Sequence, residues 1–204
     1  MKQINKLLVC GPGSIGAKHI KAAKSLNPNI DVAVIRTKPI NRYSYTDPTW
    51  LEIDSLKLGL EWSPDLIVIS SPASYHFKQT EFFSKSGIPI LLEKPIGLID
   101  DSLLKWSELD AYKTSQIKVG YLLRFDPCYL YFSQILNNSL IGKVVNSSIY
   151  SGSWLPDWRY KDYRETVSSH QGLGGGVLTE LSHELDLALS LFGDLRLDWV
   201  KLIN

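Results

Sequence analysis

The sequence is poor in cysteine, in long hydrophobic runs and in any excess of charge of one sign. Its two cysteines, Cys10 and Cys128, have a separation that fits neither a metal site nor a redox pair, so we interpret both as small hydrophobic side chains. The apolar run at residues 7–10 is too short for a signal peptide core or a membrane span. The chain is therefore expected to be cytoplasmic, without a membrane partner.

The charge balance argues against a polyanionic partner. The 22 basic and 21 acidic residues give a net charge of +1, and no long basic run is present, so a nucleic-acid partner is not expected and a small-molecule ligand fits better. With 204 residues, 44% of them hydrophobic, the chain is long enough to bury a sizeable core and to form one or two domains.

Short apolar runs rich in β-branched residues alternate with helical patterns over the first 120 residues. This alternation predicts an α/β fold in which right-handed crossovers place helices on both faces of a doubly wound parallel sheet. The expected strands span residues 6–10, 30–35, 66–70, 90–93 and 117–120, and the expected helices span residues 15–26, 74–86 and 101–112.

The periodicity changes after Gly120, where we place a domain boundary. Residues 1–120 are expected to form the first domain, and residues 121–204 part of an α+β domain for substrate binding and oligomerisation. In this second part we expect helices over residues 127–137 and 177–192, an extended segment over 144–154, a polar and aromatic loop over 156–171, and the start of a strand over 195–203.

A glycine motif lies where the first strand turns into the first helix. Gly11 permits the tight turn, Gly13 lets the backbone approach a pyrophosphate, and Gly16 allows the helix to pack on the strand. The amides at Ser14 and Ile15 and the positive helix end would face the phosphates. The motif predicts a Rossmann-type NAD(P) site; a purely structural turn, or another adenine-containing cofactor such as S-adenosylmethionine, remains an alternative.

Basic residues follow the second expected strand. An NAD-preferring site usually has a carboxylate here to accept from the ribose hydroxyls, whereas this chain has Arg36, Thr37 and Lys38. A guanidinium can pair with a 2′-phosphate, and Thr37 can add a donor, so NADP is the predicted cofactor. The alternatives are NAD and a solvated basic turn.

The Glu93-Lys94-Pro95 segment, together with the glycine turn and with Ser71 and Pro72 followed by His76, resembles the Gfo/Idh/MocA oxidoreductases. This is the family of glucose-fructose oxidoreductase and inositol dehydrogenase. The resemblance spans essentially the whole chain and also includes Gly120, Tyr121, Arg124, Phe125, Pro127, residues 174–178, Glu180, His183, Asp186, Leu191 and Gly193.

The resemblance implies that Lys94 lies on a loop after a sheet strand, beside the nicotinamide. Its ammonium would donate a proton to a carbonyl oxygen during reduction, or accept one from a hydroxyl during oxidation, with Glu93 orienting the loop. Ser71, Pro72 and His76 would line the cofactor site. An exposed lysine ahead of a proline turn is the alternative for Lys94.

The second half of the implied site comes from the helix expected over residues 177–192. Glu180 and His183 are three residues apart and share one helical face, with Asp186 continuing the line. His183 would hydrogen-bond the reacting oxygen, and Glu180 would hold the substrate or fix the imidazole tautomer. The family usually has an aspartate four residues before this histidine, whereas this chain has a glutamate three residues before it. An ordinary polar helix face is therefore the alternative. No further ligands have suitable spacing for a metal site.

The remaining histidines and the aromatic loop carry weaker expectations. His76 could approach the nicotinamide ribose or lie on a helix surface, whereas His19 and His170 are expected to be solvated. Candidate substrate contacts, with a surface loop as the alternative, are two residues at the domain junction and four in a loop rich in sugar-stacking and anion-pairing groups: Tyr121, Arg124, Trp158, Arg159, Tyr163 and Arg164.

Taken with the resemblance, these residues predict an NAD(P)-dependent oxidoreductase that transfers a hydride between nicotinamide and a sugar-like, nucleotide-sugar-like or cyclitol-like alcohol or ketone. Family members usually continue with further antiparallel strands, so we expect the second domain to be incomplete. An unpaired strand edge would favour a homo-oligomer. The alternatives are a truncated, non-catalytic dinucleotide-binding protein and a methyltransferase, which would leave the Glu93-Lys94-Pro95 segment unexplained.

Overall fold

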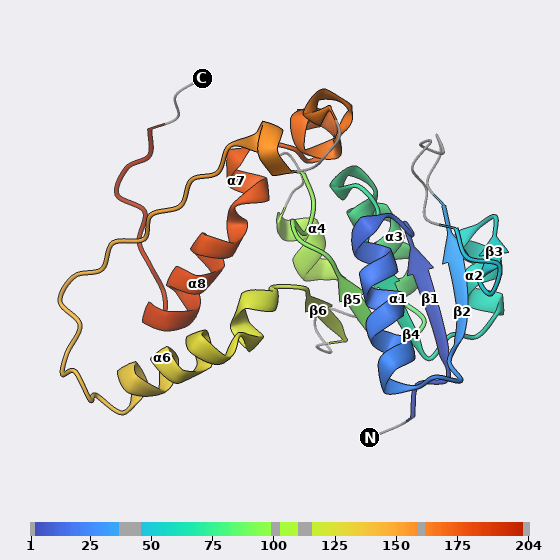
Figure 1. The fold of residues 1–204 in the computed structure, drawn as a ribbon, viewed down its shortest axis with the longest axis horizontal. Helices are drawn as coiled ribbons and strands as arrows, with labels where there is room; N and C mark the ends of the chain where they lie inside the picture. Colours follow the sequence, from blue (N-terminus) through green and yellow to red (C-terminus); the bar gives the residue numbers. More distant parts are fainter. Residues whose placement is uncertain (1–2, 37–45, 99–102, 110–115, 159–161, 202–204) are drawn as a thin grey trace.

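The computed structural model describes residues 3–36, 46–98, 103–109, 116–158 and 162–201. Its centre is a six-stranded parallel sheet in the order β3-β2-β1-β4-β5-β6 (Figure 1). The strand order reverses between β1 and β4, which is where open α/β sheets bind ligands. The doubly wound parallel sheet predicted from the sequence is confirmed. The strands are β1 (Lys6–Cys10), β2 (Asp31–Ile35), β3 (Leu51–Ile53), β4 (Leu66–Ile69), β5 (Ile90–Leu92) and β6 (Ile117–Val119).

Helices cover both faces of this sheet. Successive side chains of a strand point to opposite faces, so Leu7 and Val9 join the core beneath one helix while Leu8 and Cys10 join the core on the other side. Because both faces are covered, β1 is continuously apolar from Leu7 to Cys10 rather than alternating. The first face carries α1 (Ser14–Leu26), and the second carries α2 (Leu56–Glu61), α3 (Ala73–Ser84) and α4 (Leu103–Glu108).

Two elements of the sheet domain were not predicted. β3 is three residues long with the charged Glu52 at its centre, so it has no continuous apolar run. α2 has six residues, which is too short to show a helical period, although Ser55 caps it by accepting from the Leu58 amide at 3.2 Å. The ends of the predicted helices differ from the observed ones by one or two residues, and residues 101–102 and 110–112 lie outside the described part.

The chain after β6 forms helices and short 3-10 turns beside the β6 edge of the sheet (Figure 1). Of the described residues in 144–154 and 195–201, none lies in a strand, so the expected start of a strand near residue 195 is not observed in them, and 144–154 forms no sheet pairing. The division into domains at residue 120 stays a prediction. The elements are η1 (Leu122–Phe125), α6 (Pro127–Asn137), η2 (Leu155–Trp158), η3 (Tyr163–Glu165), η4 (Val167–Ser169), η5 (Gln171–Leu173), α7 (Val177–Glu180) and α8 (Ser182–Phe192).

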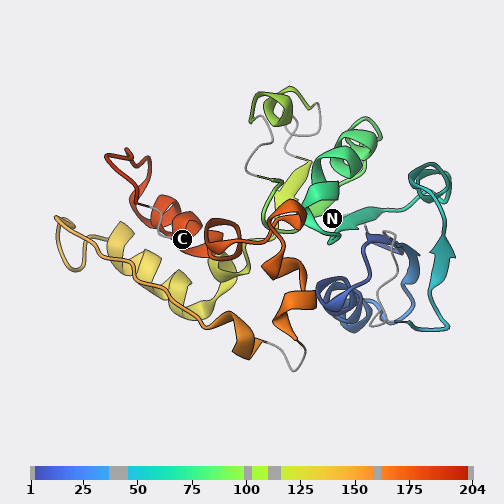
Figure 2. The ribbon, with the colours of Figure 1, turned by 90° about the horizontal axis from the view of Figure 1, so that it is seen from above.

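A glycine-rich segment docks this second part onto the sheet domain. A Cβ added at Gly174 would lie 2.4 Å from the Cβ of Ala73, at the start of α3, whereas the tight contact of Gly175, 2.4 Å from the carbonyl oxygen of Ser168, lies within the second part itself. Figure 2 shows the orange turns returning toward the sheet domain from the second part. The close packing therefore brings α7 to the carboxyl ends of the strands. Among the described helices, each falls short of the length and apolar character that crossing a membrane requires.

Candidate functional site

The turn from β1 to α1 uses its three glycines in different ways. Gly11 has φ +85°, and a Cβ there would lie 2.5 Å from the Cα of Ser71. A Cβ at Gly16 would lie 2.5 Å from the carbonyl oxygen of Gly11. At Gly13, no described atom lies within 4 Å of the added Cβ position. Packing thus requires glycine at positions 11 and 16, while the backbone at Gly13 is open to the close approach of another molecule.

The amino-terminal end of α1 carries uncompensated positive character. Its N-cap residue, Gly13, supplies no capping side chain, and the first turn contains no acidic residue. The amides of Ser14, Ile15 and Gly16 precede the first intrahelical bond, which Ala17 donates to the Gly13 carbonyl at 2.9 Å. Free amides and the helix dipole together favour an anionic group. The geometry is compatible with the predicted pyrophosphate contacts, which stay a prediction.

Arg36, which was predicted to contact a 2′-phosphate, is held by a carboxylate. Its Nε and Nη2 donate to Oε1 of Glu52 at 3.0 and 2.8 Å. These bonds hold the pKa of the Glu52 carboxyl below its usual value. Strand β3 therefore brings an acidic side chain to the end of β2, although none of the residues that directly follow β2 in the sequence is acidic. Thr37, predicted as a neighbouring donor, lies outside the described residues, as does Lys38.

The turn after β4 is buried and internally bonded. Ser71 Oγ donates to Oε1 of Gln79 at 2.7 Å, and Pro72 is the N-cap of α3. His76 is 1% exposed, with Nε2 2.7 Å from the Ser71 carbonyl oxygen and Nδ1 2.7 Å from the Pro95 carbonyl oxygen. The surface alternative for His76 is wrong. Its ring connects the β4 turn to the segment containing Lys94, and both of its ring nitrogens lie beside protein carbonyl oxygens. A direct contact with the nicotinamide ribose stays a prediction.

Lys94 meets Glu180 from the second part of the chain. Its Nζ donates to the Glu180 carbonyl oxygen at 2.9 Å and lies 3.1 Å from Oε2 of the same residue. Both side chains are largely buried, at 18% and 19% exposed. The alternative of an ordinary exposed lysine is therefore wrong. The structure brings together two residues that are 86 positions apart and that were both predicted to belong to the active site.

The helix expected over residues 177–192 is interrupted, so that part of the prediction is wrong. α7 ends at Glu180, Leu181 leaves the helical conformation with φ −100° and ψ 27°, and α8 starts at Ser182. The physical reason is visible at Glu180. Its carbonyl oxygen accepts from Lys94 Nζ. The Glu184 amide, which would bond this carbonyl in a continuous helix, donates instead to the carbonyl oxygen of Leu181 at 3.4 Å. Glu180 and His183 consequently occupy two helices rather than one face of a single helix.

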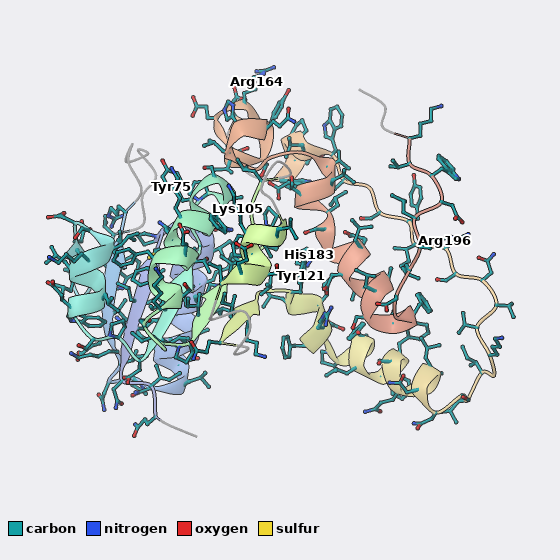
Figure 3. The ribbon with its side chains drawn as sticks, turned by 180° about the vertical axis from the view of Figure 1, so that it is seen from behind. Tyr75, Lys105, Tyr121, Arg164, His183 and Arg196 are labelled. Atoms are coloured by element: carbon teal, nitrogen blue, oxygen red, sulfur yellow. The ribbon has the colours of Figure 1, made fainter. Side chains whose placement is uncertain are left out.

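His183 lies in the first turn of α8, against Tyr121. The two rings meet edge to face, with centroids 5.7 Å apart and planes at 83°, and Figure 3 shows both at the junction between the two parts of the chain. Nδ1 of His183 is buried without a hydrogen-bond partner. A buried polar atom in this state costs about 1–3 kcal/mol, so it is a natural contact point for a polar ligand.

Arg124 and Asp186 form the tie between η1 and α8. Arg124 Nε and Nη2 donate to the two carboxylate oxygens of Asp186 at 2.8 and 2.7 Å. This bond is the largest cause of the raised pKa of Arg124. Asp186 is 8% exposed and lies three residues after His183 in α8, whereas the break at Leu181 separates both from Glu180. The guanidinium holds the second part of the chain together at this point.

His19 does not behave as the solvated helix residue that was expected. Its Nε2 lies 2.7 Å from Oε1 of Glu93, and the two side chains are 17% and 12% exposed. Glu93 immediately precedes Lys94, so α1 touches the segment that carries the candidate catalytic lysine. The prediction for His19 was wrong because its partner lies just after β5, 74 positions away, which helical periodicity cannot show.

The other predicted substrate contacts lie in the 3-10 turns and bond locally. Trp158 Nε1 donates to Ser153 Oγ, Arg164 lies 5.2 Å from the ring centroid of Tyr163, and its Nη1 lies 3.4 Å from Asp162 Oδ2. Figure 3 shows Arg164 well away from His183 and Tyr121. Substrate contact by these side chains stays a prediction, and Arg159 lies outside the described residues.

Sequence reasoning missed His19, Glu52 and Gln79, each of which contacts a predicted site residue. Gln79 lies eight positions from Ser71, but the other two partners are distant in sequence and had no local signal. Within the described ranges, no group of three or more His, Cys, Asp or Glu side chains could hold a metal ion.

Comparison with known proteins supplies a context for this geometry. Residues 5–121 match the GFO_IDH_MocA model, described as an oxidoreductase family with an NAD-binding Rossmann fold. An inositol 2-dehydrogenase of Rhizobium meliloti (strain 1021) is 26% identical over 190 residues, which cover 90% of this chain and 54% of that protein. The chain spans about half the length of such curated relatives.

Solved structures share the fold. The WlbA (WbpB) dehydrogenase from Thermus thermophilus, in complex with NAD and UDP-GlcNAcA, has a TM-score of 0.68 at 21% identity, covering 93% of this chain and 64% of that one. Scyllo-inositol dehydrogenase from Lactobacillus casei, with NAD(H) and scyllo-inositol bound, has a TM-score of 0.54 at 22% identity, covering 69% and 43%. Since the family model matches more than half of the residues, this chain belongs to the Gfo/Idh/MocA oxidoreductases with an NAD-binding Rossmann fold.

Proposed function

We propose that this chain binds a nicotinamide dinucleotide and uses Lys94 as the acid or base when a hydride passes between the nicotinamide and a cyclitol-like or sugar-like alcohol or ketone. The observation that carries this proposal is the contact between Lys94 and Glu180, which joins the two parts of the chain just beyond the carboxyl end of β5, the strand next to β4. The inositol dehydrogenases among the relatives support the substrate class.

The residues present fit a dinucleotide. The backbone at Gly13 is open, and the amides at the start of α1 suit a pyrophosphate. When bound, the dinucleotide supplies the hydride acceptor or donor. The orphaned Nδ1 of His183 would face substrate or cofactor, and an interaction with either would remove the cost of leaving that nitrogen unpaired.

Lys94 is arranged to move a proton. An ammonium has three N–H donors, and the Glu180 carbonyl and carboxylate direct two of them, which leaves the third for a substrate oxygen. In the reductive direction, that N–H would donate its proton to the carbonyl oxygen of the substrate. In the oxidative direction, the neutral amine would accept the hydroxyl proton of the substrate. Glu180 keeps Nζ in place in both directions, and His183 would hydrogen-bond the same oxygen.

Turnover tests this function. Purified protein would be assayed with myo-inositol, scyllo-inositol and nucleotide sugars, each with NAD and NADP, by the absorbance of the reduced nicotinamide. The Lys94→Met variant should lose about 10²–10⁴-fold in kcat, because it removes a general acid or base, yet it should keep its thermal stabilisation by dinucleotide. Lys57→Met, at a side chain on α2 that is 80% exposed, is the matched control. Saturable binding without turnover of any substrate would support the non-catalytic alternative instead.

The cofactor preference depends on Arg36. The sequence predicts NADP, but the Arg36–Glu52 pair favours NAD, because a 2′-phosphate would have to displace the carboxylate and lie beside its negative charge. Glu52→Gln should therefore increase the stabilisation by NADP(H) relative to NAD(H), and Arg36→Ala in the same background should reverse that gain. Wild-type protein that prefers NADP(H) and is insensitive to Glu52→Gln would contradict this assignment.

A further inference from the structure

The contact between His19 and Glu93 connects the predicted cofactor helix to the segment of the candidate catalytic lysine. His19 lies on α1, three residues after Gly16, and its Nε2 is 2.7 Å from Oε1 of Glu93. Glu93 follows the last residue of β5, and the next residue is Lys94. One hydrogen bond therefore links the helix whose first turn would face the dinucleotide to the residue beside the candidate proton-transfer group.

The Glu93 carboxylate has a defined slot. A Cβ added at Gly120 would lie 2.9 Å from Oε1, the same oxygen that contacts His19. Backbone hydrogen bonds hold the chain around the slot. The Glu93 amide donates to the carbonyl oxygen of Ile69 at 2.9 Å, and the Gly120 amide donates to the carbonyl oxygen of Leu92 at 2.8 Å. The carboxylate is thus held between α1 on one side and Gly120, just before Tyr121, on the other.

A carboxylate this deeply placed needs a hydrogen-bond donor. The neighbouring ammonium of Lys94 is directed to Glu180, so the N–H at Nε2 of His19 is the donor that the geometry supplies to Glu93. Without it, the carboxylate would turn toward water and move the backbone on which Lys94 is carried. Errors of about 1 Å in the placement of a reacting group can cost roughly 10²-fold in rate.

We propose that His19 is a positioning residue, which acts through Glu93 to keep Lys94 aligned with a dinucleotide bound at the turn of α1. Its kinetic consequence rests on the proposed function. Its structural consequence, a fixed segment over residues 93–98, can be measured in the protein without any ligand.

Three histidine variants test the proposal. His19→Ala should lower kcat about tenfold while the dissociation constant for NADH stays within about twofold of wild type. His19→Gln keeps an N–H donor at the position of Nε2 and should retain most of the rate. His170→Gln, at an exposed histidine in the second part of the chain, is the control. In the ligand-free protein, hydrogen exchange over residues 93–98 should be faster in His19→Ala than in His19→Gln.

Gly120→Ala provides a perturbation that leaves His19 in place. The new Cβ would meet the end of a side chain rather than backbone, so the carboxylate should shift and the fold should persist. We expect the same fall in kcat and the same faster exchange, and little further loss when Gly120→Ala is combined with His19→Ala, because both act on one contact.

The outcomes separate the two proposals. Unchanged exchange over residues 93–98 and unchanged kcat in His19→Ala would overturn the role of His19, as would a loss confined to NADH affinity. Absence of turnover in wild-type protein would count against the proposed function alone, and hydrogen exchange would then still decide whether His19 fixes the Lys94 segment.

Discussion

Alanine at Gly11 and at Gly13 should separate folding from binding. At Gly11, alanine must adopt φ +85°, which costs about 1–2 kcal/mol, and its Cβ would press on the Ser71 backbone, which adds about 1–3 kcal/mol. Gly11→Ala should therefore lower the free energy of unfolding by about 2–5 kcal/mol. For a chain of this size, Tm falls by about 2–4 °C for each kcal/mol.

Gly13→Ala should behave in the opposite way. Gly13 has φ −79° and ψ −161°, which alanine adopts readily, and the new methyl group points into open space. Stability should change by less than about 1 kcal/mol, since reduced freedom of the unfolded chain offsets a poorer helix cap. The methyl group would occupy the surface that a pyrophosphate approaches, so the affinity for NADH should fall about tenfold or more.

Urea denaturation followed by tryptophan fluorescence measures the first quantity, and titration calorimetry with NADH measures the second. A Gly13→Ala protein that binds NADH with wild-type affinity would refute the placement of the pyrophosphate at this turn. Equal stability of the Gly11→Ala and Gly13→Ala proteins would refute the packing argument for the turn.

Two further predictions concern the thiols and the Arg124–Asp186 pair. Burial raises the pKa of Cys10 to about 12, so near neutral pH a thiol reagent should label exposed Cys128 at once and Cys10 only after unfolding. Because the unfolded thiol ionises near its ordinary pKa of about 8.5 while the folded one keeps its proton, stability should fall as pH rises from about 8.5 toward 12, and Cys10→Val should remove this component. Asp186→Ala should destabilise the protein by about 1–2 kcal/mol in urea denaturation, since it removes both bonds from Arg124, and an effect below about 0.3 kcal/mol would show that the tie is dispensable.

The sequence determined the sheet domain because its information is local there. Buried parallel strands are continuous apolar runs, and the three glycines after β1 form a motif that can be recognised at that place in the chain. The same reasoning missed β3 and α2, which are too short to have a period. It also joined α7 and α8 into one helix, because nothing in residues 177–192 signals that Lys94 takes the Glu180 carbonyl oxygen.

The candidate site was only partly contained in the sequence. Lys94, Glu180 and His183 could be selected from their motifs, whereas their arrangement depends on how the second part of the chain docks through its glycines. The partner of Arg36 is Glu52, on the neighbouring strand β3, and the partner of Glu93 is His19, on a helix 74 residues earlier. Sequence periodicity shows which face of an element is buried, but contacts between distant elements exist only once the sheet has assembled. Tertiary structure therefore decided which groups surround the predicted residues.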